Sequence, residues 1–82
     1  MTTSFHLEDI IQPAAVAFGA RVKARRKVLG LTQTDIYKRT GIGIGYLSSI
    51  ERGRANPTLD MMIKLSAALG LEIWDLLRPT DE

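Results

Sequence analysis

Cysteine is absent from the 82-residue chain, and histidine occurs once, at His6. No disulfide can therefore form, and the chain has no residue set for a Cys/His metal site or a cysteine nucleophile. The apolar runs 14–17 and 61–63 are much shorter than the about 20 residues that a transmembrane helix needs, and residues 1–5 carry no basic side chain of the kind that opens a signal peptide. We therefore expect a cytoplasmic protein that is not an enzyme and uses no metal or cofactor.

Charge is unevenly distributed along the chain, although the net charge is only +2. Residues 1–19 carry −2 and residues 55–82 carry −3, whereas residues 20–54 hold nine Lys and Arg against two Asp and Glu, a net +7. A basic middle section of this kind indicates a polyanionic partner, although charges also gather on exposed helix faces that bind nothing.

A chain of this length is expected to form one domain around one modest core.

Glycine, proline and capping residues divide the chain into five predicted helices, at 13–29, 33–40, 44–51, 59–69 and 73–77. The apolar stripe of the first helix is expected to contain Ala14, Phe18, Val22 and Leu29. No segment alternates with the period of a strand. The predicted fold class is therefore all-α, a compact five-helix bundle in which a tight glycine turn joins helices 33–40 and 44–51. We divide the chain into an N-terminal segment (1–12), a helical domain (13–78) and a tail (79–82).

The segment LTQTDIYKRTGIGIGYLSSIERG, residues 31–53, followed by NPTLDMMIKLSAALG, resembles the Xre or Cro/C1-type helix-turn-helix family. This family includes lambdoid phage repressors and restriction-modification controller proteins. The resemblance covers about residues 18–77 and implies that helix 44–51 enters the major groove of double-stranded DNA. It also implies a sequence-specific transcriptional regulator, a repressor, that acts as a homodimer on a pseudo-palindromic operator.

The resemblance assigns roles to individual residues. An ion pair joins Arg26 to Glu51. Base readout falls on Ile44, Gly45, Tyr46, Ser48 and Ser49. Phosphate contacts fall on Thr32, Gln33, Lys38, Arg52 and Arg54, with Lys23, Arg25, Lys27 and Arg39 as further outer candidates. The dimer interface falls on Ile73, Trp74 and Leu77.

Two features depart from the family's pattern. Ile44 and Gly45 lie where relatives often carry hydrogen-bonding side chains, so the front of this helix offers a methyl surface and bare backbone to the bases. Ser48, Ser49 and Tyr46 then supply most of the hydrogen-bonding capacity, and DNA shape can supply further specificity. Tyr37 lies where relatives usually have alanine, so its side chain must point outward or shift the crossing of the two helices.

Several assignments have a second interpretation. Thr32 can act as a helix cap alone, Arg26 can bind phosphate, Ile44 can pack within its own domain, and Trp74 can fill the core. The GIGIG turn is glycine-rich like a nucleotide-binding loop, but it lacks the preceding strand and the Lys-Ser/Thr pair of such a loop. The competing function is an antitoxin-like module that binds a partner protein and contacts DNA only secondarily.

Overall fold

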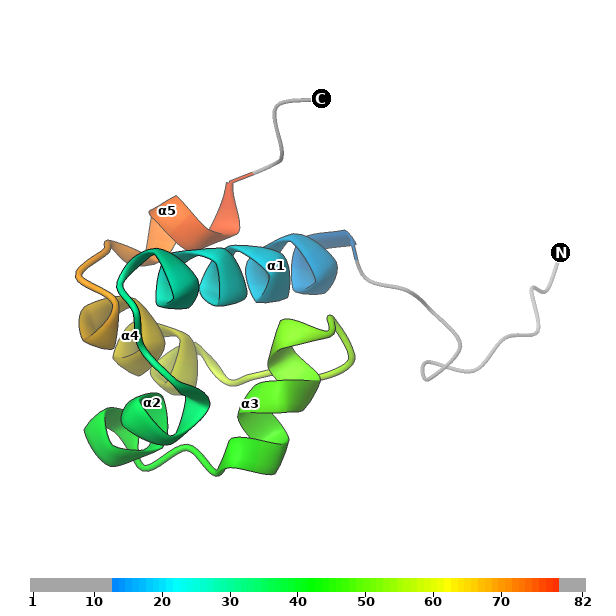
Figure 1. Ribbon diagram of the computed structural model, residues 1–82. Coiled ribbons are helices and arrows are strands. Elements are labelled where there is room, and N and C mark those ends of the chain that lie inside the picture. Colours follow the sequence, from blue (N-terminus) through cyan, green and yellow to red (C-terminus); the bar gives the residue numbers. More distant parts are fainter. Residues whose placement is uncertain (1–12, 79–82) are drawn as a thin grey trace, which may run out of the picture.

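The computed structural model describes residues 13–78, and within them every regular element is an α-helix (Figure 1). The helices are α1 (Pro13–Val28), α2 (Gln33–Thr40), α3 (Ile44–Glu51), α4 (Leu59–Ala68) and α5 (Ile73–Leu77). The predicted five-helix, all-α fold is confirmed, and the predicted ranges differ only by one residue at the ends of α1 and α4. The predicted N-terminal segment and tail lie outside the described residues.

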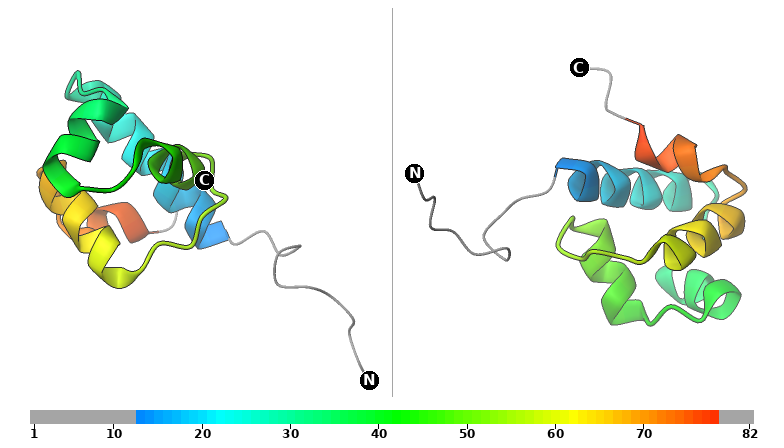
Figure 2. Two further views of the ribbon diagram at one scale, coloured as in Figure 1. Left: turned by 90° about the horizontal axis from the view of Figure 1, so that it is seen from below. Right: turned by 180° about the vertical axis from the view of Figure 1, so that it is seen from behind.

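Helix α1 runs through the middle of the bundle. It packs against α3 on one side and α5 on the other, and α4 contacts both α2 and α5 (Figures 1 and 2). Helices α2 and α3 also contact each other across a short turn, residues 41–43. The result is a helix-turn-helix unit that is supported from behind by α1 and α4.

The core takes side chains from every helix, at the three- and four-residue spacings that place them on one helix face. Its fully or almost fully buried members are Phe18, Val22, Ile36, Ile42, Leu47, Ile50, Leu65, Leu69 and Leu76. Leu31, Met61 and Met62 are partly buried and pack against this cluster. Because the cluster spans all five helices, burial of these side chains fixes the position of α3 relative to the remainder of the bundle.

The expected inward stripe of α1 is wrong at both of its ends, since Ala14 and Leu29 are exposed. Ala14 lies one turn before the first core residue of α1, at the rim of the bundle. Leu29 lies beyond the end of the helix, where Gly30 adopts a φ of 71° and turns the chain away from the helical path. The backbone N–H of Leu31 then donates to the carbonyl oxygen of Arg26 (3.0 Å), and Leu31 packs against the core instead.

Helices α1 and α3 lie in close contact at Gly19. A Cβ atom at this position would lie 1.9 Å from the carbonyl oxygen of Ile50, far inside van der Waals contact. Only glycine allows this approach, which sets the distance between α1 and the end of α3.

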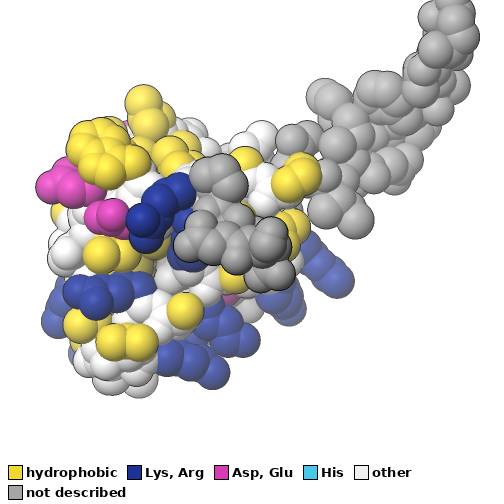
Figure 3. All heavy atoms as spheres, turned by 90° about the horizontal axis from the view of Figure 1, so that it is seen from above, with side chains coloured by type: hydrophobic (Ala, Val, Ile, Leu, Met, Phe, Trp, Pro, Cys, Tyr) yellow, Lys and Arg dark blue, Asp and Glu magenta, His cyan; other side chains and the backbone are white. Residues whose placement is uncertain are grey.

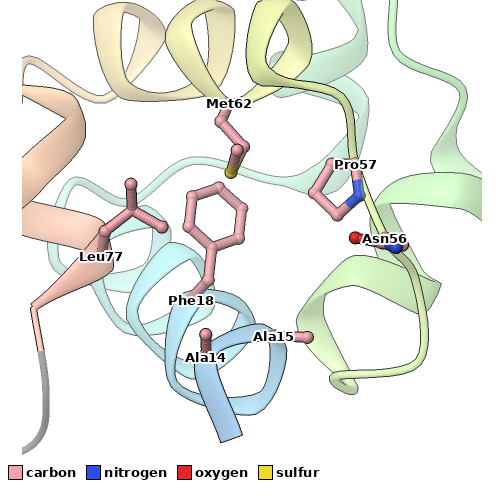
Figure 4. A pocket seen from close by; sticks show the side chains of 7 residues that line it. All are labelled: Ala14, Ala15, Phe18, Asn56, Pro57, Met62 and Leu77. Atoms are coloured by element: carbon pink, nitrogen blue, oxygen red, sulfur yellow. The ribbon is translucent and has the colours of Figure 1, made fainter. Parts of the chain in front are cut away.

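A mostly apolar pocket of ≈ 320 Å³ opens between the start of α1, the loop before α4, and α5 (Figure 4). Its lining residues are Ala14, Ala15, Phe18, Asn56, Pro57, Met62 and Leu77. Only Asn56 contributes a polar side chain, so the pocket offers no group for acid–base chemistry.

Among residues 13–78, no cluster of three or more metal-ligating side chains occurs. None of the described helices is long and apolar enough to cross a membrane.

Candidate nucleic-acid interface

Helix α2 begins with a capping box formed by Thr32 and Asp35. The Thr32 hydroxyl accepts a hydrogen bond from the backbone N–H of Asp35 (3.0 Å), and the Asp35 carboxylate accepts one from the backbone N–H of Thr32 (2.8 Å). Hydrogen bonding to the Asp35 carboxylate by Thr32, first from its backbone N–H and then from its side chain, holds the pKa of Asp35 below its ordinary value. Thr32 therefore serves as a helix cap, and its predicted phosphate contact stays a prediction.

A buried ion pair joins α1 to the end of α3. Arg26 donates from Nε and Nη2 to the two carboxylate oxygens of Glu51, at 2.7 and 3.0 Å, and the two side chains are only 11% and 3% exposed. A third donor of the guanidinium, Nη1, reaches the carbonyl oxygen of Leu31 (2.9 Å). The hydrogen bonds to Glu51 raise the pKa of Arg26 above its ordinary value. The alternative role of Arg26 in phosphate binding is inconsistent with this burial.

Gln33 extends this network to the start of α2. Its side-chain amide Nε2 donates to Oε1 of Glu51 (3.1 Å), and the residue is half-buried. One carboxylate thus holds α1, α2 and α3 together. Sequence reasoning missed this contact because Gln33 and Glu51 lie on different helices and no periodic pattern links them. One of the two N–H groups of the Gln33 amide is thus engaged within the protein, and its predicted phosphate contact stays a prediction.

Helix α3 buries one face and leaves the other open. Leu47, Ile50 and Glu51 are buried, whereas Ile44 and Tyr46 are 41% and 39% exposed. Gly45 is exposed, and Ser48 and Ser49 are half-buried. The alternative that Ile44 packs within the domain is therefore wrong. The five candidate base-reading residues lie on the helix that the structure leaves partly open to solvent.

Three of the predicted phosphate-binding residues lie on the surface around α2 and α3. Lys38 is near the end of α2, Arg52 is at the end of α3, and Arg54 is in the loop that follows; all three are exposed. Within residues 13–78, their charged groups take part in no ion pair and no side-chain hydrogen bond. They can therefore meet an external anion without breaking a contact inside the protein.

Two arginines that were expected as outer phosphate contacts also contact the end of α4. Arg25 donates from Nε to the carbonyl oxygen of Leu69 (2.9 Å), and Arg39 donates from Nη1 to that of Ala68 (3.1 Å). The last carbonyl groups of a helix lack partners within the helix and attract cations. Both arginines therefore stabilise the end of α4, each through one N–H of its guanidinium, and their expected phosphate contacts stay a prediction.

Helix α5 presents apolar side chains at the surface. Trp74 is 65% exposed and Leu77 is 39% exposed, while Ile73 is half-buried. Figure 3 looks onto the side formed by α1 and α5 and shows hydrophobic side chains beside acidic ones at one end. The alternative that Trp74 fills the core is wrong.

Tyr37 on α2 also points outward, with 48% of it exposed, so α2 and α3 pack without having to accommodate its ring.

The sequence model of the helix-turn-helix family matches residues 22–73. One relative, the uncharacterized HTH-type transcriptional regulator y4dJ of Sinorhizobium fredii, is 44% identical over 64 residues, which cover 78% of this chain and 83% of y4dJ. The HTH-type transcriptional regulator SinR of Bacillus licheniformis is 37% identical over 65 residues, which cover 78% of this chain but only 59% of SinR. Some relatives of this chain, such as SinR, are thus considerably longer than the part that matches it.

Solved structures agree with this relationship. The restriction-modification controller protein C.AhdI of Aeromonas hydrophila has a TM-score of 0.72 and 34% identity, over 76% of this chain and 94% of C.AhdI. The biofilm regulator SinR in complex with DNA has a TM-score of 0.70 and 35% identity, over 74% of this chain and 98% of that chain. The match to the family's sequence model, residues 22–73, covers more than half of the chain, including the end of α1, the helix-turn-helix unit and α4. The chain therefore belongs to the Cro/C1-type helix-turn-helix family.

Proposed function

We propose that this protein is a transcriptional regulator, a repressor, that binds double-stranded DNA in a sequence-specific manner. The observation that carries the proposal is the position of α3, which is held from behind by Gly19 and the Arg26–Glu51 ion pair and is open on its outer face. An α-helix fits the major groove of B-DNA, where each base pair presents a different pattern of groups. The similarity to SinR, whose structure was solved in complex with DNA, supports the same docking.

Base and phosphate contacts divide between two groups of residues. The outer face of α3 reads base edges through the hydroxyl groups of Ser48, Ser49 and Tyr46 and through the apolar front at Ile44 and Gly45. Lys38, Arg52 and Arg54 contact phosphate groups beside the groove. The start of α2, with Thr32 and Gln33, adds backbone and amide donors once the phosphate approaches.

The protein acts as a homodimer in the cytoplasm. A single helix-turn-helix unit covers one half-site, and two units about 34 Å apart read a pseudo-palindromic operator with higher affinity. The apolar side chains of Ile73, Trp74 and Leu77 supply the dimer surface, because burying Trp74 and Leu77 removes exposed apolar area from water.

Selection of bound sequences from random double-stranded DNA tests the binding proposal. We expect enriched sites with two inverted half-sites whose centres lie about 10 base pairs apart. Ser49→Ala should change the preferred base at one position of each half-site, whereas Arg54→Ala should weaken binding to every sequence. Enrichment of no sequence over the starting pool would contradict the proposal and would favour the antitoxin-like alternative.

Equilibrium sedimentation tests the dimer. The parent chain should associate at micromolar concentration, and Trp74→Ala should weaken this association together with operator binding. Val28→Ala is the matched control, since Val28 is 75% exposed on α1 and lies outside the proposed dimer surface. A monomeric parent, or an equal effect of both substitutions, would refute the assignment of the interface to α5.

A further inference from the structure

Gly45 occupies a position that the fold itself does not reserve for glycine. It lies within α3, has no positive φ, and an added Cβ would meet no atom within 4 Å. Gly19 differs in this respect, because a Cβ there would collide with backbone. Glycine within a helix costs about 0.5 to 1 kcal/mol relative to alanine. Packing inside the protein therefore gives no reason for this residue, and a close approach from outside does.

Ile44, the neighbouring residue, is a large apolar side chain that the core does not need. It is 41% exposed at the first position of α3. Neither Ile44 nor Gly45 can exchange hydrogen bonds with a base through a side chain, and Gly43 before them provides no side-chain cap to α3. The front of α3 thus combines an apolar projection with an adjacent flat surface.

The 5-methyl group of thymine is the apolar feature on the major-groove edges of the four bases. We propose that Ile44 packs against this methyl group while Gly45 lets the helix approach closely. The front of α3 then recognises the 5-methyl group itself, whichever pyrimidine base carries it. The inference rests on the proposed DNA binding. Because 5-methylcytosine carries its methyl group at the same ring position, and no side chain here reads the neighbouring amino or carbonyl group, methylated cytosine should replace thymine.

The test uses the full chain and a site obtained by selection. At each thymine of a half-site, fluorescence anisotropy compares thymine, deoxyuridine, cytosine and 5-methylcytosine. At one or two positions we expect sites with thymine and with 5-methylcytosine to be bound equally well. Sites with deoxyuridine or cytosine there should be bound about fourfold more weakly, because one methyl group is no longer buried against the protein. Equal binding of deoxyuridine and thymine at every position, or of cytosine and 5-methylcytosine, would overturn the inference.

Two variants assign the effect to these residues. Ile44→Ala should remove the difference between thymine and deoxyuridine, whereas Ile63→Ala, which shortens an isoleucine of α4 that is 49% exposed, should preserve it. Gly45→Ala should weaken binding severalfold without lowering the melting temperature, because the added methyl group is accommodated by the free protein. Undiminished binding by Gly45→Ala would refute the close approach.

Selection separates this inference from the proposal on which it rests. A chain that enriches no DNA sequence would fail the proposed function itself. Enrichment of a defined operator that is indifferent to the methyl groups would leave the regulator intact and overturn only the role of Ile44 and Gly45.

Discussion

Replacing Glu51 by alanine should lower the free energy of unfolding by about 3 to 5 kcal/mol, because the substitution leaves a buried guanidinium without its counter-charge. The carboxylate accepts hydrogen bonds from Arg26 at 2.7 and 3.0 Å and from Gln33 at 3.1 Å. Water cannot take its place easily, since the Arg26 side chain is only 11% exposed. A domain of this size has a total stability of about 4 to 12 kcal/mol, so the loss is a large part of the whole.

Urea unfolding followed by far-ultraviolet circular dichroism measures the effect in Glu51→Ala, Arg26→Ala and the double variant. The sum of the losses in unfolding free energy of the two single variants should exceed the loss of the double variant, because each single variant leaves one buried charge without its partner. Lys64→Ala is the control. It removes an exposed ion pair with Asp60, 3.0 Å long and four residues apart in α4, and should cost no more than about 0.5 kcal/mol.

A paired apolar replacement distinguishes the stranded charge from a general loss of packing. Arg26→Met combined with Glu51→Leu should be much less destabilising than either alanine variant, and it provides the measurement if a single variant does not fold. A cost below about 1 kcal/mol for Glu51→Ala, or strict additivity of the two alanine substitutions, would refute the reasoning.

Gly19→Ala should destabilise the fold by about 2 kcal/mol or more, measured by urea unfolding, because its Cβ would lie 1.9 Å from the Ile50 carbonyl oxygen; full stability would contradict the tight α1–α3 contact. The folded-state pKa of Asp35 is below its ordinary value of 3.8, so the stability that it contributes is present above that value and is lost as the pH falls through the lowered pKa. Thermal melts of Asp35→Asn should show a deficit at neutral pH that shrinks in acid, and a deficit independent of pH would be inconsistent with the capping box. Arg54→Ala should reduce the slope of log affinity against log salt by about 1.8 in a titration of operator DNA, about 0.9 for each protomer of the dimer, and an unchanged slope would exclude its phosphate contact.

The helices were predictable because the signals that begin and end them are local. Thr32 caps α2 and Thr58 caps α4, and glycines with positive φ follow α1, α2 and α4 within a few residues. The expected ends of α1 and α4 differ from the structure by one residue because the last predicted residue of each forms part of the turn that follows. The Arg26–Glu51 pair came from the resemblance, since their separation of 25 residues follows no helical spacing.

The remaining polar contacts depend on how the helices pack, which the local pattern does not contain. Arg25 reaches across 44 residues to Leu69, and Arg39 reaches across 29 residues to Ala68. Nine basic residues in the middle of the chain were equally eligible for such roles. Likewise, a helical stripe does not say whether Ile44 or Trp74 lies at the core or at the surface, because each is in the first turn of its helix, where the preceding turn that would extend the stripe is missing.

These internal contacts affect how many of the basic residues in 20–54 are available to contact phosphate groups. An arginine that donates to a carbonyl group keeps its charge and still contributes to long-range attraction of DNA. Its remaining N–H groups can still donate to a phosphate, but the carbonyl contact restricts where the guanidinium lies, and Arg26 is neutralised by Glu51. Within residues 20–54, five exposed cations have no internal side-chain partner among the described residues: Lys23, Lys27, Lys38, Arg52 and Arg54. If these five cations are the ones that contact phosphate, this section neutralises about five phosphates per protomer, which corresponds to a salt slope of about −4.5 per protomer, and phosphate contacts by further arginines would make the slope steeper.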